Sequence, residues 1–87
     1  MGKFRKKPVV IEAVQFRSGE ELHDLSNEVI TGRVRYTEDG TVLISTLEGT
    51  MEARDGDWII RGVADELYPC KPDIFAQTYE AVEDSTQ

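Results

Sequence analysis

Cysteine and long apolar runs are the features that this 87-residue sequence most lacks. Its single cysteine, Cys70, excludes an intramolecular disulfide and with it the cysteine framework of many small secreted proteins. Apolar runs such as Val9–Ile11 are far shorter than the roughly 20 residues that cross a bilayer, and the acidic Glu12 soon follows the basic start. We therefore expect a protein of the reducing cytoplasm, with no membrane span and no signal peptide.

Basic residues are scarce outside the first few positions. The chain has 10 Lys or Arg against 17 Asp or Glu, a net charge of −7, and four of the basic residues lie within residues 1–7. The acidic remainder repels phosphate backbones, so direct nucleic-acid binding is not expected. The basic arm, residues 1–7, could still touch phosphate, or it could keep the first strand soluble and protect a sheet edge.

The first half of the chain predicts a strand and a helix. Residues 8–16 are rich in β-branched side chains, which indicates a central strand. Ser18 and Glu21 have the spacing of a helix-capping box, and a helix over residues 19–28 is expected to end near Gly32. The apolar residues of this helix form one stripe: Leu22, Leu25 and Val29.

Beyond Gly32 the apolar residues alternate, which is typical of antiparallel strands with short turns. The expected elements are strands at residues 33–37, 41–47, 50–54 and 58–63, an extended segment at 66–70, a short helical turn at 71–77 and a closing strand at 78–82. The predicted fold class is α+β. It is a single domain, residues 1–87, with one amphipathic helix packed on a strongly curved, mostly antiparallel sheet or partly open barrel, and with frayed residues 83–87.

Three segments carry a resemblance to a known family: Phe4–Gln15, Gly56–Val63 and Tyr68–Phe75. In these segments, and over nearly the whole chain, the sequence resembles a family of small tailed-bacteriophage and prophage proteins of unknown function. Members commonly read Pro-Gly-Asp where this chain has Asp55 before Gly56, a change compatible with the same turn. The resemblance implies a phage origin and supplies no activity.

The sequence offers no set of catalytic or metal-binding residues. It contains no Gly-rich phosphate loop and no serine nucleophile elbow. Cys70 and the only histidine, His23, are far apart in sequence and form neither a cysteine–histidine motif nor a closed zinc set. We therefore expect a protein that is not an enzyme and that has no cofactor and no metal.

Binding residues are sought where unusual side chains concentrate, between Asp55 and Phe75. Aromatic faces and cationic donors in this segment could hold an anionic or carboxylate-bearing partner. Alternatively, the aromatic residues fill the core and the cations point outward. The candidates are Trp58, Arg61, Tyr68, Lys71 and Asp73.

These observations favour a small phage-encoded accessory protein, a non-enzymatic binding module that acts on a host protein or assembly in the infected cell. One alternative is a sequestering protein that counters host defence by holding a small anionic, nucleotide-type ligand through Arg61 and Lys71. Another is a minor virion or assembly component. The small core also makes a homo-oligomer an expectation.

Overall fold

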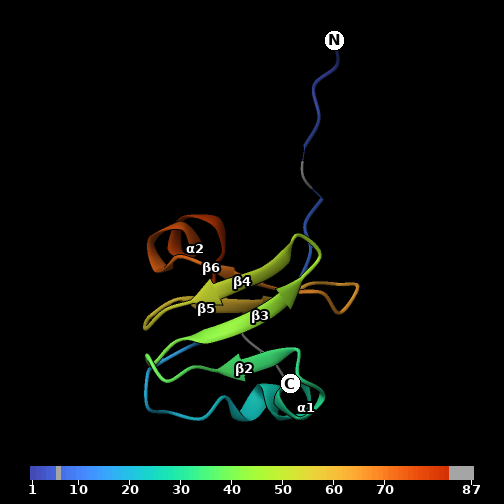
Figure 1. Cartoon of the computed structure of the whole chain (residues 1–87). Helices are drawn as coiled ribbons and strands as arrows, with labels where there is room; N and C mark the ends of the chain where they lie inside the picture. Colours follow the sequence, from blue (N-terminus) through green and yellow to red (C-terminus); the bar gives the residue numbers. More distant parts are fainter. Residues whose placement is uncertain (6, 83–87) are drawn as a thin grey trace, which may run out of the picture.

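The computed structural model describes residues 1–5 and 7–82 (Figure 1). Within these residues, six strands, a 3-10 turn and two helices follow one another. They are β1 (Glu12–Gln15), η1 (His23–Leu25), α1 (Ser26–Thr31), β2 (Val34–Tyr36), β3 (Val42–Thr46), β4 (Gly49–Ala53), β5 (Trp58–Arg61), β6 (Leu67–Cys70) and α2 (Pro72–Thr78).

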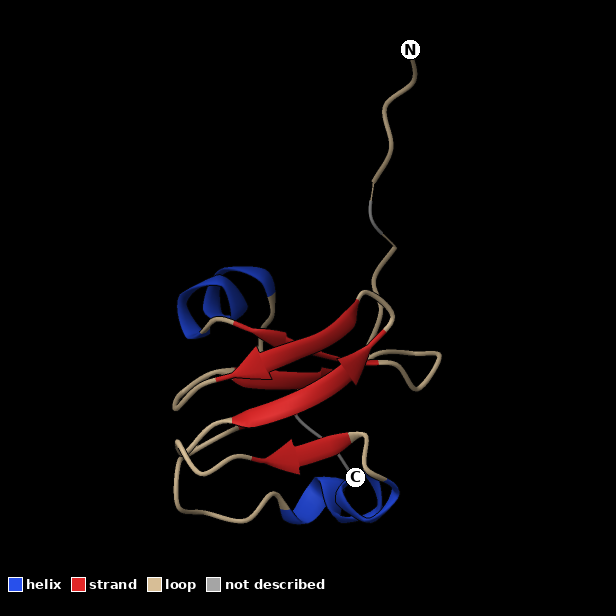
Figure 2. Ribbon diagram, in the orientation of Figure 1, coloured by secondary structure: helices blue, strands red, loops and turns tan. Residues whose placement is uncertain are grey.

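The strands form two antiparallel sheets of three strands each, in the orders β1-β5-β6 and β2-β3-β4. β6 lies against β3 and β4, so the two sheets face each other (Figure 2). The α+β class and the antiparallel strands are thus confirmed. The strands do not close into a barrel, because β4 does not pair with β5.

The core fills the space between the two sheets. Alternate residues point inward, as the period of two along a strand requires. From one sheet these are Ile59 and Leu67, and from the other Val34, Val42 and Ile44. The stripe that the sequence predicts, Leu22, Leu25 and Val29, packs on the same core together with Phe16.

The two helices lie at opposite ends of the molecule (Figure 1). α1 lies beside β2, and Gly32 ends it with a φ of 86°, a left-handed conformation that glycine adopts without strain. α2 lies against the face of the β1-β5-β6 sheet that points away from the core, where Trp58 stacks on Phe75. This outer face is therefore covered in part by α2.

The predicted start of the first helix is wrong. Gly19 has a φ of 86°, and helical structure begins only at His23. The side chain of Ser18 donates to the carbonyl of Gly40 and its amide donates to Asp55, so Ser18 ties together two loops instead of capping a helix. Distant hydrogen bonds have replaced the local capping box.

The first strand is not central as predicted, because β1 is an edge strand and β5 lies in the middle of its sheet. The predicted meander is also divided after β4. Phe16 exchanges backbone hydrogen bonds with Gly56 and Asp57, so the turn after β4 joins the end of β1. The buried Asp57 carboxylate accepts the amide of Arg54 at 2.9 Å and closes this turn.

The end of the described chain is helical where the sequence predicts both a helical turn and a strand. Pro72 occupies the start of α2, as expected for a residue without an amide hydrogen. The helix continues to Thr78, and residues 79–82 form no strand. The closing strand at residues 78–82 is therefore a wrong prediction, and the prediction for residues 83–87 concerns positions outside the described residues.

Candidate functional site

Aromatic side chains gather between α2 and the outer face of the β1-β5-β6 sheet. The rings of Trp58 and Phe75 are stacked, with centroids 4.2 Å apart and an interplanar angle of 6°. Phe75 in turn contacts Tyr79, at a centroid distance of 5.1 Å. Tyr68 lies on the same sheet face as Trp58, since β5 and β6 pair Ile60 with Tyr68. The structure therefore brings two of the five candidate residues to one face.

The two tyrosines at this face are joined through their hydroxyls, whose oxygens lie 3.5 Å apart. This hydrogen bond, reinforced by burial, raises the pKa of Tyr68 to about 12. Tyr68 is consequently a neutral donor or acceptor across the whole physiological range. Its role in the fold is to connect β6 to the residue that follows α2.

Two adjoining surface hollows lie beside the aromatic cluster, with volumes of about 330 and 630 Å³. Both are bounded by the chain leading into β1 and by the chain leaving α2. We call them together the outer groove. Residues that line both hollows are Val9, Val10, Ile11, Tyr79, Glu80 and Val82.

The outer groove is apolar and open to solvent. Val10 and Val82 are 73 % and 69 % exposed, and Val63, which lines the larger hollow, is 75 % exposed. Among the residues that the structure describes, its charged lining is Glu66, Glu80 and Lys7. Several exposed valines beside one another mark an interaction surface more strongly than single exposed apolar residues do.

Arg61 does not belong to this face. It alternates with Ile60 along β5 and lies on the side of the sheet that carries Ile59. Its guanidinium forms salt bridges with Glu12 at 3.5 Å, with Glu28 at 3.0 Å and with Asp65. The hydrogen bonds that Arg61 donates to Glu28 and Asp65 raise the pKa of Arg61 and lower the pKa of both carboxyls.

This carboxylate surrounding gives Arg61 a structural task. It connects β5 to α1 and to the turn at residue 65, and its donors are directed at the chain's own acids. A hollow that Arg61 lines also contains the acids Glu12 and Asp24. An anionic ligand would have to displace these carboxylates, which counts against the sequestering alternative.

Lys71 and Asp73 lie at the start of α2 and are exposed. The Lys71 carbonyl accepts the amide of Phe75 at 2.8 Å, and a carboxylate oxygen of Asp73 accepts the amide of Ile74 at 2.9 Å. An acid in the first turn also suits the helix dipole. Both residues thus help to begin the helix that carries Phe75, and Arg61 lies on the opposite side of the sheet from them.

Cys70 and His23 lie in different parts of the fold. Cys70 ends β6, and burial raises the pKa of its thiol, with the charges of Asp57 and Asp73 acting in the same direction. His23 lies in η1 and faces Glu21, with 3.7 Å between the imidazole and the carboxylate. These influences disfavour the thiolate form of Cys70. Among residues 1–5 and 7–82, no three His, Cys, Asp or Glu residues are placed to hold a metal ion.

Neither the groove nor the ring partners of Trp58 could be recognised from the sequence. Phe75 and Tyr79 are four residues apart, a spacing that puts two aromatic rings on one face of a helix. Interpreting residues 78–82 as a strand hid this signal. The exposure of the valines could not be predicted from the sequence, because a run of β-branched residues has the same pattern whether or not another part of the fold covers it.

Comparison with known proteins finds no matching family model, no significantly similar curated protein and no significantly similar solved structure. Within the described part of the chain, the helices are too short to cross a membrane.

Proposed function

We propose that the protein is a non-enzymatic binding module and that it holds an extended, apolar segment of a partner protein in the outer groove. The observation that carries this proposal is the row of exposed valines along two adjoining hollows, beside the stacked pair of Trp58 and Phe75. A partner that covers this surface removes apolar area from water, which stabilises the complex by about 25 cal/mol per Å² of apolar area buried.

The base of the groove is held in place by packed side chains, and its edges are exposed to solvent. Ile60 is completely buried beneath the outer face, and the stacked rings fix α2 against the sheet. Val10 and Val82 stand on the two walls, where a bound segment reaches both. A preformed site of this kind loses little conformational entropy on binding.

The resemblance to bacteriophage proteins supports a partner in the infected cell, a host protein or a host assembly. Residues 8–87 carry a large excess of acids, which favours a partner surface with basic residues around an apolar contact. The accessory role in infection is part of the same proposal.

Site-specific photo-cross-linking tests this function directly. A benzophenone amino acid is placed at Val82 in the groove and, as the matched control, at Ile30, which is 82 % exposed on α1 at the other end of the molecule. In host cells we expect position 82 to give one discrete cross-linked product, whose yield the Val10→Ser substitution lowers. Position 30 should give no such product. Equal labelling at both positions, or labelling that Val10→Ser leaves unchanged, would contradict the proposal.

A further inference from the structure

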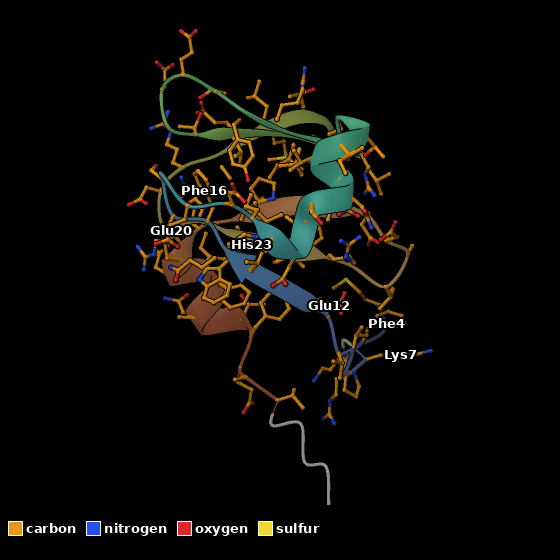
Figure 3. The ribbon with its side chains drawn as sticks, turned by 90° about the horizontal axis from the view of Figure 1, so that it is seen from below. Phe4, Lys7, Glu12, Phe16, Glu20 and His23 are labelled. Atoms are coloured by element: carbon orange, nitrogen blue, oxygen red, sulfur yellow. The ribbon has the colours of Figure 1, made fainter. Side chains whose placement is uncertain are left out.

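The N-terminal arm is the most exposed part of the described chain. Residues 1–5 extend away from the body, and Phe4 is 96 % exposed (Figure 1). Figure 3 shows Phe4 and Lys7 beyond Glu12 and apart from Phe16 and His23. Among the described residues, Lys3, Arg5 and Lys7 take part in no salt bridge. The arm therefore presents one aromatic ring flanked by cations that form no salt bridge with the rest of the described chain.

The outer groove has the complementary character. Its lining is mostly apolar, and among the described residues its charged members are Glu66 and Glu80 with Lys7 at the rim. It belongs to a body that contains six Lys or Arg and 17 Asp or Glu over residues 8–87. A phenylalanine ring suits the hollows beside the exposed valines. The adjacent cations suit the acids of the wall and of the body around it.

The arm is poorly placed to fill the groove of its own chain. Residues 7–11 form one wall of the groove, so the arm begins at the rim and points outward. Pro8 holds Lys7 in an extended conformation, because its ring clashes with a helical residue before it. No glycine lies between Phe4 and Pro8 to provide a tight reversal. A second copy meets no such restriction.

We infer that two copies of the chain exchange their N-terminal arms, with Phe4 of each copy seated in the outer groove of the other. Four residues from Phe4 to Pro8 span about 13 to 14 Å when extended, which carries the ring across the rim into a groove that begins at residue 7. The exchange is reciprocal, so a two-fold dimer satisfies both arms and both grooves at once. This inference rests on the proposed function and deepens it, because the arm of a second copy holds the same groove until a partner segment displaces it.

The first test is the mass of the full-length protein in solution, by light scattering and sedimentation over a range of concentrations. We expect a dimer whose dissociation constant rises about a hundredfold in Phe4→Ser, since each dimer loses two buried aromatic rings. The control Ile30→Ser removes an equally exposed apolar side chain from α1 and should leave the dimer unchanged. Raising the salt concentration should weaken the dimer, because the cations and acids are exposed to solvent.

A second measurement locates the contact. A benzophenone amino acid at position 4 should cross-link to a second copy at peptides that contain Val63 or Val82, whose positions line the groove. A monomer at every concentration, or a dimer that Phe4→Ser does not weaken, overturns arm exchange. Cross-links from position 4 to α1 instead of the groove overturn it as well.

Failure of this inference and failure of the proposed function give different results. If arm exchange is wrong and the function is right, the chain is a monomer, and position 82 still cross-links a host protein. If the function is wrong and arm exchange is right, position 82 cross-links only a second copy, and Phe4→Ser abolishes that product.

Discussion

The ion pair between Glu28 and Arg61 connects α1 to the middle strand of the β1-β5-β6 sheet, and its removal is a direct test of how the two parts are joined. The carboxylate and guanidinium lie 3.0 Å apart, with side chains that are 12 % and 22 % exposed. Of the salt bridges among the described residues, this pair is the least exposed. Glu28→Gln removes the charge and keeps the shape.

The expected loss of stability is about 1 to 2 kcal/mol at pH 7. A hydrogen bond to a charged group contributes about 1.5 to 3 kcal/mol, and part of it survives because the amide oxygen of Gln can still accept. Arg61 also keeps Glu12 and Asp65 as partners, so its charge is not left alone. For a domain of this size the loss corresponds to a fall in Tm of roughly 4 to 16 °C.

The pH dependence gives the sharper result. The hydrogen bond from Arg61 lowers the pKa of Glu28 below its ordinary value of 4.5. Because the folded pKa is depressed, the stabilisation is fully present above the unfolded pKa and is lost as the pH falls from about 4.5 through the folded pKa. The stability gap between the native protein and Glu28→Gln should therefore shrink as the pH is lowered from 7 to 3.5.

Urea denaturation at several pH values measures this gap, with Glu20→Gln as the matched control. Glu20 is exposed and has no salt bridge in the described part of the chain, so its substitution should change stability little at any pH. Equal destabilisation by the two substitutions at pH 7 would refute the reasoning. A gap for Glu28→Gln that stays constant between pH 7 and pH 3.5 would refute its electrostatic part.

Three further predictions concern the outer face. Phe75→Ala should cost about 2 kcal/mol and shift the fluorescence of Trp58, the only tryptophan, to longer wavelength, because the stacked ring leaves water in its place; an unchanged spectrum would contradict the stacking. Ultraviolet titration should show Tyr68 ionising near pH 12, and Tyr79→Phe should lower the pKa of Tyr68 because it removes the hydroxyl partner. Since the folded pKa of Tyr68 is raised, the stability that this hydrogen bond contributes is present below about pH 10 and is lost as the pH rises toward 12. Iodoacetamide should alkylate Cys70 at pH 7.5 several-fold more slowly in the native protein than in urea, because burial raises the pKa of the thiol; equal rates would show that the thiol is accessible and unperturbed.

The antiparallel strands were predictable, because short turns and apolar residues at every second position allow few registers between neighbouring strands. Gly40 and Gly49 take positive φ values in the two turns that join β2, β3 and β4. The inward stripe of Leu22, Leu25 and Val29 was predictable for a similar reason, since each of these residues can be buried only on one side. Even where the helix begins later than expected, the buried face is the same.

The candidate site was less predictable, because strand parity and distant contacts decide it. Trp58 and Arg61 are three residues apart on a strand, so they point to opposite faces once β5 is fixed between β1 and β6. The sequence shows that both are present, and it does not show which face each receives.

By itself the sequence determined the class of fold, the positions of most strands, the short helix that begins at Pro72, and the contrast between a basic arm and an acidic body. These are local properties, set by side-chain alternation, turn residues and composition. Only the tertiary structure decided that the strands divide into two facing sheets, that Ser18 joins loops instead of capping a helix, and that exposed valines from residues 9–11 and 79–82 border one groove. Each of these depends on contacts between residues far apart in the chain, which no local pattern encodes.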